Sequence, residues 1–287
     1  MRTRQNLHMH SLWDDGRNSC REMLAACRDQ GLAAGGISLH SPMPFANDWT
    51  CTADRVKDYL REMNGLRQAW PDFRVLCGIE WDVLSTQVDL TSFDYVIGSV
   101  HHLPVREVPP SVDNTPDELA ETVRIDFGGD ADAAAECYFQ ELLKVAAEPR
   151  VRICGHFDLL LKFNERLHLF NPESSRYRKA AHLALEALLD AGKVIEVNTG
   201  AMSRGWRSVP YPEAYWLQEI RRRHGRVLLS SDAHSAAHVT YYFEEAEALL
   251  EACGFDVVAE LNSSGEFAEI SLKNGGLRHG PSGHDKK

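Results

Sequence analysis

Residues 95–101 read Tyr-Val-Ile-Gly-Ser-Val-His, a short apolar run that ends in a histidine. The run is too short for a typical buried helix and too uniformly apolar for a surface strand, so it predicts a parallel strand buried on both faces. Six further runs have the same character. The seven predicted strands cover residues 5–8, 34–40, 74–80, 95–101, 151–156, 194–198 and 227–232.

Longer amphipathic segments separate these runs, and they have the spacing of helices. The predicted helices cover residues 19–30, 52–70, 131–147, 174–191, 212–224 and 242–253. Strands that alternate with helices predict a parallel sheet. Seven such units favour an α/β barrel with one unit fewer than the usual eight, and an open doubly wound sheet is the alternative. We expect one domain over residues 1–274.

Two segments depart from this alternation. The connection over residues 103–130 contains four prolines and a Gly-Gly pair, and it follows a candidate metal ligand directly. Connections of this length in a compact domain are usually functional or mobile. We therefore expect a lid-like insertion or a pocket wall rather than an inert loop. The tail over residues 275–287 is rich in Gly, His and Lys, and we expect it to be disordered.

Composition limits the classes of function. The formal net charge is −11, and the only basic cluster is at residues 221–223, which speaks against a nucleic-acid partner. No apolar run approaches the ~20 residues of a membrane span, and the polar start shows no signal peptide, so we expect a cytoplasmic protein. Seven cysteines without C-x-x-C spacing predict reduced, buried thiols. Nothing in the sequence indicates an oligomeric state.

Residues of the kind that bind metals stand at the ends of six of the seven predicted strands. They are His8, His10, His40, Glu80, His101, His156, Asp232 and His234. The carboxyl ends of parallel strands in a barrel converge on one face, where active sites form. One histidine at a strand end is usually an ordinary polar residue, but this set predicts a metal site. Imidazole and carboxylate together favour Zn, Mn or Fe over Ca or Mg alone.

The motifs are also familiar as an ordered set. Residues 6–11, Asn-Leu-His-Met-His-Ser, followed by Asp14-Asp15-Gly16, resemble the opening motif of the PHP (polymerase and histidinol phosphatase) family. Segments 37–40, 78–80, 98–101, 155–159 and 231–234 match later motifs in the same order. The loop over residues 40–45, leading to Trp49, resembles that of the monofunctional histidinol-phosphatases. Asn6 and Leu39 replace aspartates that are common in the family, but neither lies at an expected ligand position.

The resemblance implies a distorted (βα)₇ TIM-like barrel of the PHP type and about three divalent ions (Zn, Mn or Fe). It implies hydrolysis of L-histidinol phosphate to L-histidinol and phosphate, a step of histidine biosynthesis, by a hydroxide that bridges two metals. The first metal is expected on His8, His10, Glu80 and Asp232. Glu80 is expected to bridge to the second, on His101 and His156, and the third is expected on Asp15, His40 and His234. Among these, Glu80, Asp232 and His234 are the expected catalytic residues.

Four further residues have expected roles near this site. Lys162 and Arg204 follow strand ends, and we expect them to bind the substrate phosphate, the alternative being a solvated charge. Glu196 is expected to orient a ligand histidine or meet the substrate amine, or else to be a buried ion-pair partner. His102 is expected to point away from His101 and to be structural, because neighbouring side chains on a strand alternate.

Three rival functions fit parts of the sequence. Another phosphoesterase of the PHP type, acting on a different small phosphate ester or a nucleotide, would have the same ligands. A nuclease or proofreading module would need a basic, aromatic-lined groove, which the acidic balance does not favour. A metal-binding scaffold without activity would be expected to have lost ligands, and here all nine are present.

Overall fold

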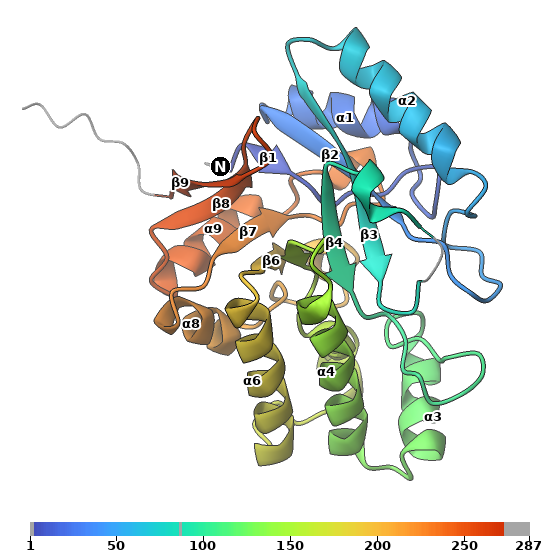
Figure 1. Cartoon of the computed structure of the whole chain (residues 1–287). Helices are drawn as coiled ribbons and strands as arrows, with labels where there is room; N and C mark the ends of the chain where they lie inside the picture. The colour runs from blue at the N-terminus through green and yellow to red at the C-terminus, as the bar shows by residue number, and fades with distance from the viewer. Residues whose placement is uncertain (1–2, 86–87, 273–287) are drawn as a thin grey trace, which may run out of the picture.

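The computed structural model describes residues 3–85 and 88–272, and it contains a seven-stranded parallel sheet (Figure 1). The strands lie side by side in chain order, and each pairs with its neighbours in parallel, as predicted. They are β1 (Gln5–Asn6), β2 (Ala34–His40), β3 (Arg74–Asp82), β4 (Tyr95–Ser99), β5 (Ile153–Cys154), β6 (Val194–Asn198) and β7 (Val227–Ser230). The strand predicted over 151–156 keeps only two residues in the sheet, whereas β3 runs two residues further than predicted.

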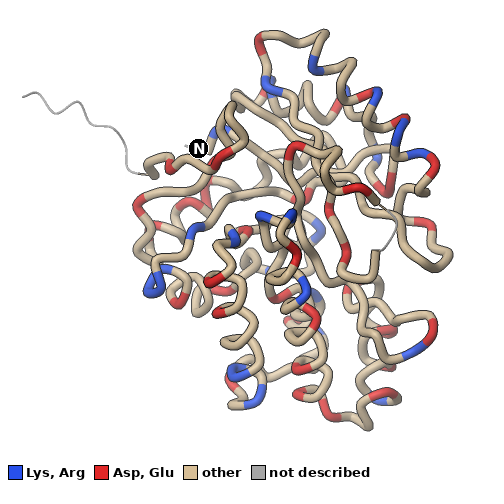
Figure 2. Tube along the Cα trace, in the orientation of Figure 1, with Lys and Arg blue, Asp and Glu red and all other residues tan. Residues whose placement is uncertain are grey.

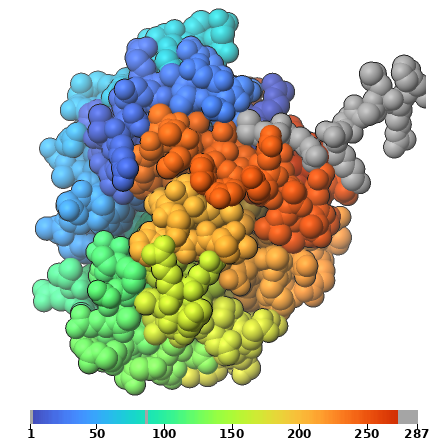
Figure 3. Space-filling view, turned by 180° about the vertical axis from the view of Figure 1, so that it is seen from behind, coloured from blue at the N-terminus to red at the C-terminus, as the bar shows by residue number. Residues whose placement is uncertain are grey.

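The first and last strands of this sheet meet, so the sheet closes into a nearly complete barrel. Met9 and Ala233 form a parallel bridge, and His10 N donates to the Ala233 carbonyl at 2.9 Å. Viewed from behind, the N-terminal segment lies beside the segment around residue 230 (Figure 3). The predicted barrel is therefore confirmed, and the alternative of an open sheet is wrong.

Helices cover the outside of the barrel (Figure 1). The longer ones are α1 (Cys20–Asp29), α2 (Val56–Ala69), α3 (Pro116–Asp126), α4 (Ala131–Ala147), α6 (Ser175–Asp190), α8 (Ala214–Arg222) and α9 (Phe243–Ala252). Single turns are α5 (Asn164–Leu167), α7 (Gly200–Ser203), η1 (Leu90–Ser92), η2 (Leu159–Leu161) and η3 (Ala236–His238). Helix α3 lies within the connection predicted over 103–130 and was not predicted. Pro116 at its start and the Thr115 cap, whose hydroxyl accepts from Glu118 N at 3.1 Å, explain where it begins.

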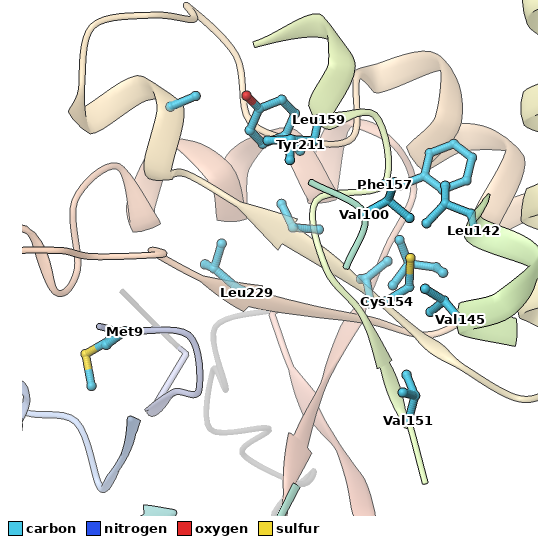
Figure 4. Close-up of a cluster of buried hydrophobic side chains, with 14 of the residues drawn as sticks. Met9, Val100, Leu142, Val145, Val151, Cys154, Phe157, Leu159, Tyr211 and Leu229 are labelled. Atoms are coloured by element: carbon cyan, nitrogen blue, oxygen red, sulfur yellow. The ribbon is translucent and has the colours of Figure 1, made fainter. Parts of the chain in front are cut away.

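Alternation along the strands sorts side chains into an inner and an outer layer. The outer layer packs against the helices, and Figure 4 shows Leu142 and Val145 of α4 beside Val151, Cys154 and Phe157. Six of the seven cysteines are buried and all are unpaired, which confirms the predicted free thiols. Burial raises the pKa of these thiols, for Cys77 to about 12.

The inner layer is apolar only at the end of the barrel where the strands begin. Tyr95 fills the centre there, and its hydroxyl donates to the Leu7 carbonyl at 2.5 Å. Gly36 and Gly78 make room for this ring, since a Cβ atom on Gly78 would lie 2.1 Å from it. Further along the same faces the residues become polar, and they lead to the candidate site at the other end.

A two-stranded antiparallel hairpin closes the apolar end, and the sequence did not predict it. It consists of β8 (Val257–Leu261) and β9 (Phe267–Ser271). The Gln5 side chain donates to the Leu261 carbonyl at 3.0 Å and accepts from its amide at 2.9 Å. The hairpin therefore packs over the apolar interior at this end, and the polar inward-facing residues lie toward the carboxyl ends of the strands.

Acidic and basic positions are interspersed along the outer helices (Figure 2). Among residues 3–85 and 88–272, no helix combines the length and apolar character needed to cross a bilayer. The predicted disordered tail over 275–287 lies outside the described residues.

Candidate metal centre

Six imidazoles and three carboxylates converge where the strands of the barrel end. They are the nine predicted ligands, His8, His10, Asp15, His40, Glu80, His101, His156, Asp232 and His234. The convergence follows from sheet register, because His40 and Glu80 are direct partners in the β2–β3 ladder. Alternate residues of a strand face the same side, and both His40 and Glu80 belong to the set that faces the barrel interior. Local alternation and register thus bring together residues that are far apart in the chain.

Glu80 lies at the centre of this cluster and is almost completely buried. Its Oε1 atom lies 2.9 Å from His156 Nε2 and 3.2 Å from His101 Nε2. Its Oε2 atom lies 3.1 Å from His8 Nε2 and 3.0 Å from His40 Nδ1. One carboxylate therefore touches imidazoles from four segments, which is the arrangement that a ligand shared between two ions requires.

The ligand atoms form four overlapping groups, within each of which they lie no more than 4.8 Å apart. The groups are His10, Asp15, His40 and His234; His8, Glu80 and His156; His8, His10 and Asp232; and His40, Glu80 and His101. Residues shared between the groups mean that neighbouring cations would have ligands in common. The cluster therefore has the donors for more than one ion.

Several buried polar atoms of the cluster lack hydrogen-bond partners, and this bears on whether the cluster could bind divalent cations. Within the described residues, His8 Nε2, His10 Nε2, His40 Nδ1 and Glu80 Oε2 are buried and have no aligned hydrogen-bond partner. Each such atom costs roughly 1–3 kcal/mol when it is left unsatisfied. All four point into one space, and a cation there would satisfy them together. Imidazole nitrogens with carboxylate oxygens are ordinary ligands for divalent transition metals, so the residues fit a divalent-metal site.

Carboxylates behind the cluster hold three of the ligand rings from their far side. Glu196 contacts His8 Nδ1 at 2.5 Å. Asp14 contacts His10 Nδ1 at 3.0 Å, and Asp82 contacts His101 Nδ1 at 3.0 Å. Such partners fix the tautomer and the orientation of a ligand histidine.

Asp14 and Asp82 were missed by the sequence analysis as partners of these rings. A signal for Asp82 was present, because it lies two residues after Glu80 and therefore on the same face of β3. Asp14 had a weaker signal, since it follows the opening motif in a turn. Its position depends on that turn folding back toward His10.

The charges of the cluster are strongly coupled. Burial alone would lower the pKa of His8, but Glu196, Glu80 and Asp232 raise it well above its usual value. Burial would likewise lower the pKa of His10, but Asp14 and Asp232 raise it to about 10. Burial would raise the pKa of Asp232, and Arg204 and His8 instead hold it well below its usual range. Without a metal, the positive charge of Arg204 and of the protonated rings keeps these carboxylates ionised, and a cation that binds would have to displace protons from the rings.

A cavity of about 450 Å³ opens above the cluster. Its floor contains Asp15, His40, Glu80, His101, His156, Asp232 and His234. The segment predicted over 103–130 supplies one wall, with Val108, Pro109, Ser111, Asp113, Asn114 and Glu118. Part of the segment therefore lines the cavity. The volume suits a small-molecule ligand.

Both predicted phosphate-binding residues line this cavity. Arg204 donates to Asp232 Oδ2 at 3.2 Å, and its Nη1 lies 3.1 Å from His234 Nδ1. Lys162 donates to the Asp113 carbonyl at 2.6 Å and to its carboxylate at 3.1 Å. Neither residue is a solvated surface charge. Lys162 ties the wall segment to the turn η2, a contact that the sequence did not suggest.

The structure also places His102, Asn6 and Leu39, which the sequence analysis named outside the ligand set. His102 lines the cavity together with His101, so the expectation that it points away is wrong. The chain leaves the β4 ladder at Ser99, and strict alternation no longer holds beyond it. Asn6 accepts from His8 N at 3.1 Å and donates to Ser231 Oγ at 2.6 Å, so it links the first and last motifs. Leu39 lies in the outer core.

Comparison with known proteins agrees with this geometry. The model of the PHP domain matches residues 6–200, more than half of the chain, and the protein therefore belongs to the PHP domain family. A protein of Deinococcus radiodurans named "Probable histidinol-phosphatase" is 29% identical over 254 residues, which cover 83% of this chain and 89% of that protein.

Two other proteins are similar to this chain, one over a short segment of sequence and one in fold. The DNA polymerase/3'-5' exonuclease PolX of Bacillus subtilis is 39% identical over 103 residues, but the match spans only 33% of this chain and 18% of PolX. The histidinol phosphate phosphatase of Lactococcus lactis, solved in complex with zinc, L-histidinol and phosphate, aligns with a TM-score of 0.66. That alignment covers 94% of this chain and 97% of the other at 20% identity, so it establishes a shared fold.

Proposed function

We propose that this protein is a metal-dependent histidinol-phosphatase, which hydrolyses L-histidinol phosphate to L-histidinol and phosphate. The observation that carries the proposal is a cluster of nine metal-binding side chains, with four unpaired buried atoms, at the floor of a small cavity that also contains Arg204 and Lys162. Cations beside basic residues suit a phosphate dianion. The names of the Deinococcus radiodurans and Lactococcus lactis proteins support the specific substrate.

We infer that the cluster holds about three divalent ions, because its ligand groups overlap through shared residues. The first ion would lie on His8, His10, Glu80 and Asp232, the second on Glu80, His101 and His156, and the third on Asp15, His40 and His234. Zinc is supported by its presence in the Lactococcus lactis complex, and Mn or Fe would accept the same ligands.

When bound, the ions would activate a water molecule for attack on phosphorus and neutralise charge on the phosphate oxygens. The side chains have separate tasks around that chemistry. Arg204 lies beside Asp232 and His234, and its guanidinium would donate to phosphate oxygens there. Lys162 adds a second positive charge at the cavity wall. Glu196 keeps the His8 ring in place, and the wall over residues 103–130 limits the access of bulk water to the cavity.

The first experiment measures phosphate release from L-histidinol phosphate, AMP, glycerol phosphate and p-nitrophenyl phosphate. Each assay is run after chelation and again after resupply of Zn²⁺ or Mn²⁺. We expect metal-dependent release with at least ~100-fold higher kcat/KM for histidinol phosphate, which is about 2.7 kcal/mol of differential transition-state binding. Metal-dependent release without that preference would leave a phosphoesterase of another specificity. No release from any ester by the metal-loaded protein would refute the proposal.

A second candidate is hydrolysis of a phosphodiester in single-stranded DNA, which the local identity to PolX favours. The acidic residues Asp113 and Glu118 in the cavity wall count against it, because they would repel a DNA backbone. Incubation of the metal-loaded protein with a labelled single-stranded oligonucleotide tests this candidate. Shortening of the oligonucleotide at a rate comparable to release from small esters would favour it over the first.

A further inference from the structure

The cavity has an aromatic side in addition to its metal-binding floor. Phe45, Trp49 and His102 form this side. The His102 ring is stacked on Trp49 with centroids 5.6 Å apart and an interplanar angle of 23°, and Phe45 meets it edge-on at 5.2 Å. Trp49 in turn contacts the His40 ring at 4.7 Å. The orientation of the His102 ring is therefore fixed by packing on two sides.

The two ring nitrogens of His102 have different surroundings. The residue is only 5% exposed, and its Nδ1 atom is buried with no hydrogen-bond partner among residues 3–85 and 88–272. His102 also lines the cavity, and its Nε2 atom, unlike Nδ1, is not among the buried unpaired atoms of the described residues, so we take Nε2 as the nitrogen that faces the cavity. At a pH well above the ordinary histidine pKa of about 6.5, an imidazole is neutral.

A neutral imidazole carries its single proton on one of the two nitrogens. Buried N–H groups without an acceptor are rarer in proteins than buried acceptors without a donor. The unpaired Nδ1 of His102 is therefore the nitrogen without the proton, and Nε2 carries it. The aromatic side of the cavity consequently presents one fixed, uncharged hydrogen-bond donor.

We propose that His102 is a specificity-determining residue, whose Nε2–H donates a hydrogen bond to the unprotonated ring nitrogen of the substrate's imidazole. This inference rests on the proposed function and extends it to the part of the substrate that does not react. The phosphate group is drawn to the metal floor and Arg204, which leaves the aromatic side for the flat, neutral end of the molecule. Trp49 and Phe45 supply the apolar surface that a planar ring needs.

The test compares two esters that differ only in the ring, L-histidinol phosphate and 2-aminopropyl phosphate. The variant is His102→Phe, which keeps an aromatic ring against Trp49 but removes both nitrogens. We expect kcat/KM for histidinol phosphate to fall about 10- to 100-fold, because the substrate nitrogen loses its buried partner. The loss should be mainly in KM, since the contact is remote from the reacting atoms. For 2-aminopropyl phosphate we expect a change of less than about twofold.

Two further variants separate recognition from a structural role. His102→Gln places an amide donor close to the position of Nε2, and we expect it to recover about tenfold of the loss on histidinol phosphate. His182→Phe is the matched control, because His182 also packs against aromatic rings, Tyr215 and Trp216, but outside the cavity. We expect it to behave as the wild type. Metal content and the urea midpoint are measured for every variant.

The outcomes distinguish this inference from the proposed function. If the wild type prefers histidinol phosphate and His102→Phe keeps that preference, the inference is wrong and the function stands. Equal losses of kcat/KM on both esters in His102→Phe would assign His102 a structural role and overturn the inference. If the wild type does not prefer histidinol phosphate, the proposed function fails, and the inference fails with it.

Discussion

Replacing Glu196 by glutamine tests whether the carboxylate behind the cluster controls metal binding. Glu196 is fully buried and accepts four hydrogen bonds, two on each oxygen. Oε1 accepts from His8 Nδ1 and Ser230 Oγ, both at 2.5 Å. Oε2 accepts from His156 N at 2.8 Å and from Asn198 Nδ2 at 3.0 Å. Glutamine keeps one acceptor oxygen, so one pair of donors would face an NH₂ group instead.

The expected loss follows from those contacts. The glutamine amide can place its NH₂ group at either oxygen position. In one orientation the His8 ring loses its acceptor, and in the other the His156 backbone N–H loses its acceptor. A candidate ligand residue is therefore affected in both cases. Partners of this kind typically contribute 10- to 100-fold to metal affinity. We therefore expect Glu196→Gln to weaken metal binding by that factor, which is about 1.4–2.7 kcal/mol.

Equilibrium dialysis against buffered Zn²⁺ or Mn²⁺, with metal content read by atomic emission, measures the affinity. Phosphate release at rising metal concentration shows whether excess metal restores activity, as we expect. Glu141→Gln is the matched control, since Glu141 is a buried carboxylate on α4 that pairs with Lys144 away from the cavity. A metal affinity within twofold of the wild type, or an equal loss in the control, would refute the reasoning.

Three further predictions concern packing, phosphate and thiols. Gly78→Ala places a Cβ atom 2.1 Å from the Tyr95 ring and should lower stability by about 1–3 kcal/mol in urea unfolding, whereas Gly65→Ala in α2 meets open space and should not. Arg204→Ala should lower kcat/KM about 10²-fold without lowering the urea midpoint. Because burial raises thiol pKa values, a disulfide reagent at pH 8 should react quickly with Cys137 at most, and with all seven cysteines in urea.

Each of these predictions has a result that contradicts it. Equal urea midpoints for the two glycine variants would mean that the barrel interior is not tightly packed around Tyr95. An unchanged kcat/KM for Arg204→Ala would remove that residue from phosphate binding. Fast reaction of several thiols in the native protein would show that the core opens readily.

Short-range patterns in the sequence were enough to predict the seven parallel strands and the candidate metal-binding residues at their ends. The alternation of apolar runs and amphipathic segments predicted seven strands, because each element buries its own apolar face. Ligand residues could be found because the end of a strand is a local feature, and parallel strands place their carboxyl ends together. His40 and Glu80 illustrate this, since each is simply the polar residue that ends an inward-facing series.

Other features depended on contacts between residues far apart in the chain. The pairing of Met9 with Ala233 closes the barrel, and no local pattern distinguishes a closed sheet from an open one. The β8–β9 hairpin is held by Gln5, from the other end of the chain, and Lys162 meets Asp113 only because two connections fold over the same cavity.

The direction of individual side chains was also decided by tertiary structure. His102 was expected to point away because alternation was extended beyond the last ladder residue, Ser99. In the folded protein its ring is instead held in the cavity wall by Trp49 and Phe45. The sequence alone determined which residue types stand at the strand ends, because alternation and strand length are local properties. Only the tertiary structure decided what each ring faces and which carboxylate holds it, because those contacts join segments that local periodicity does not relate.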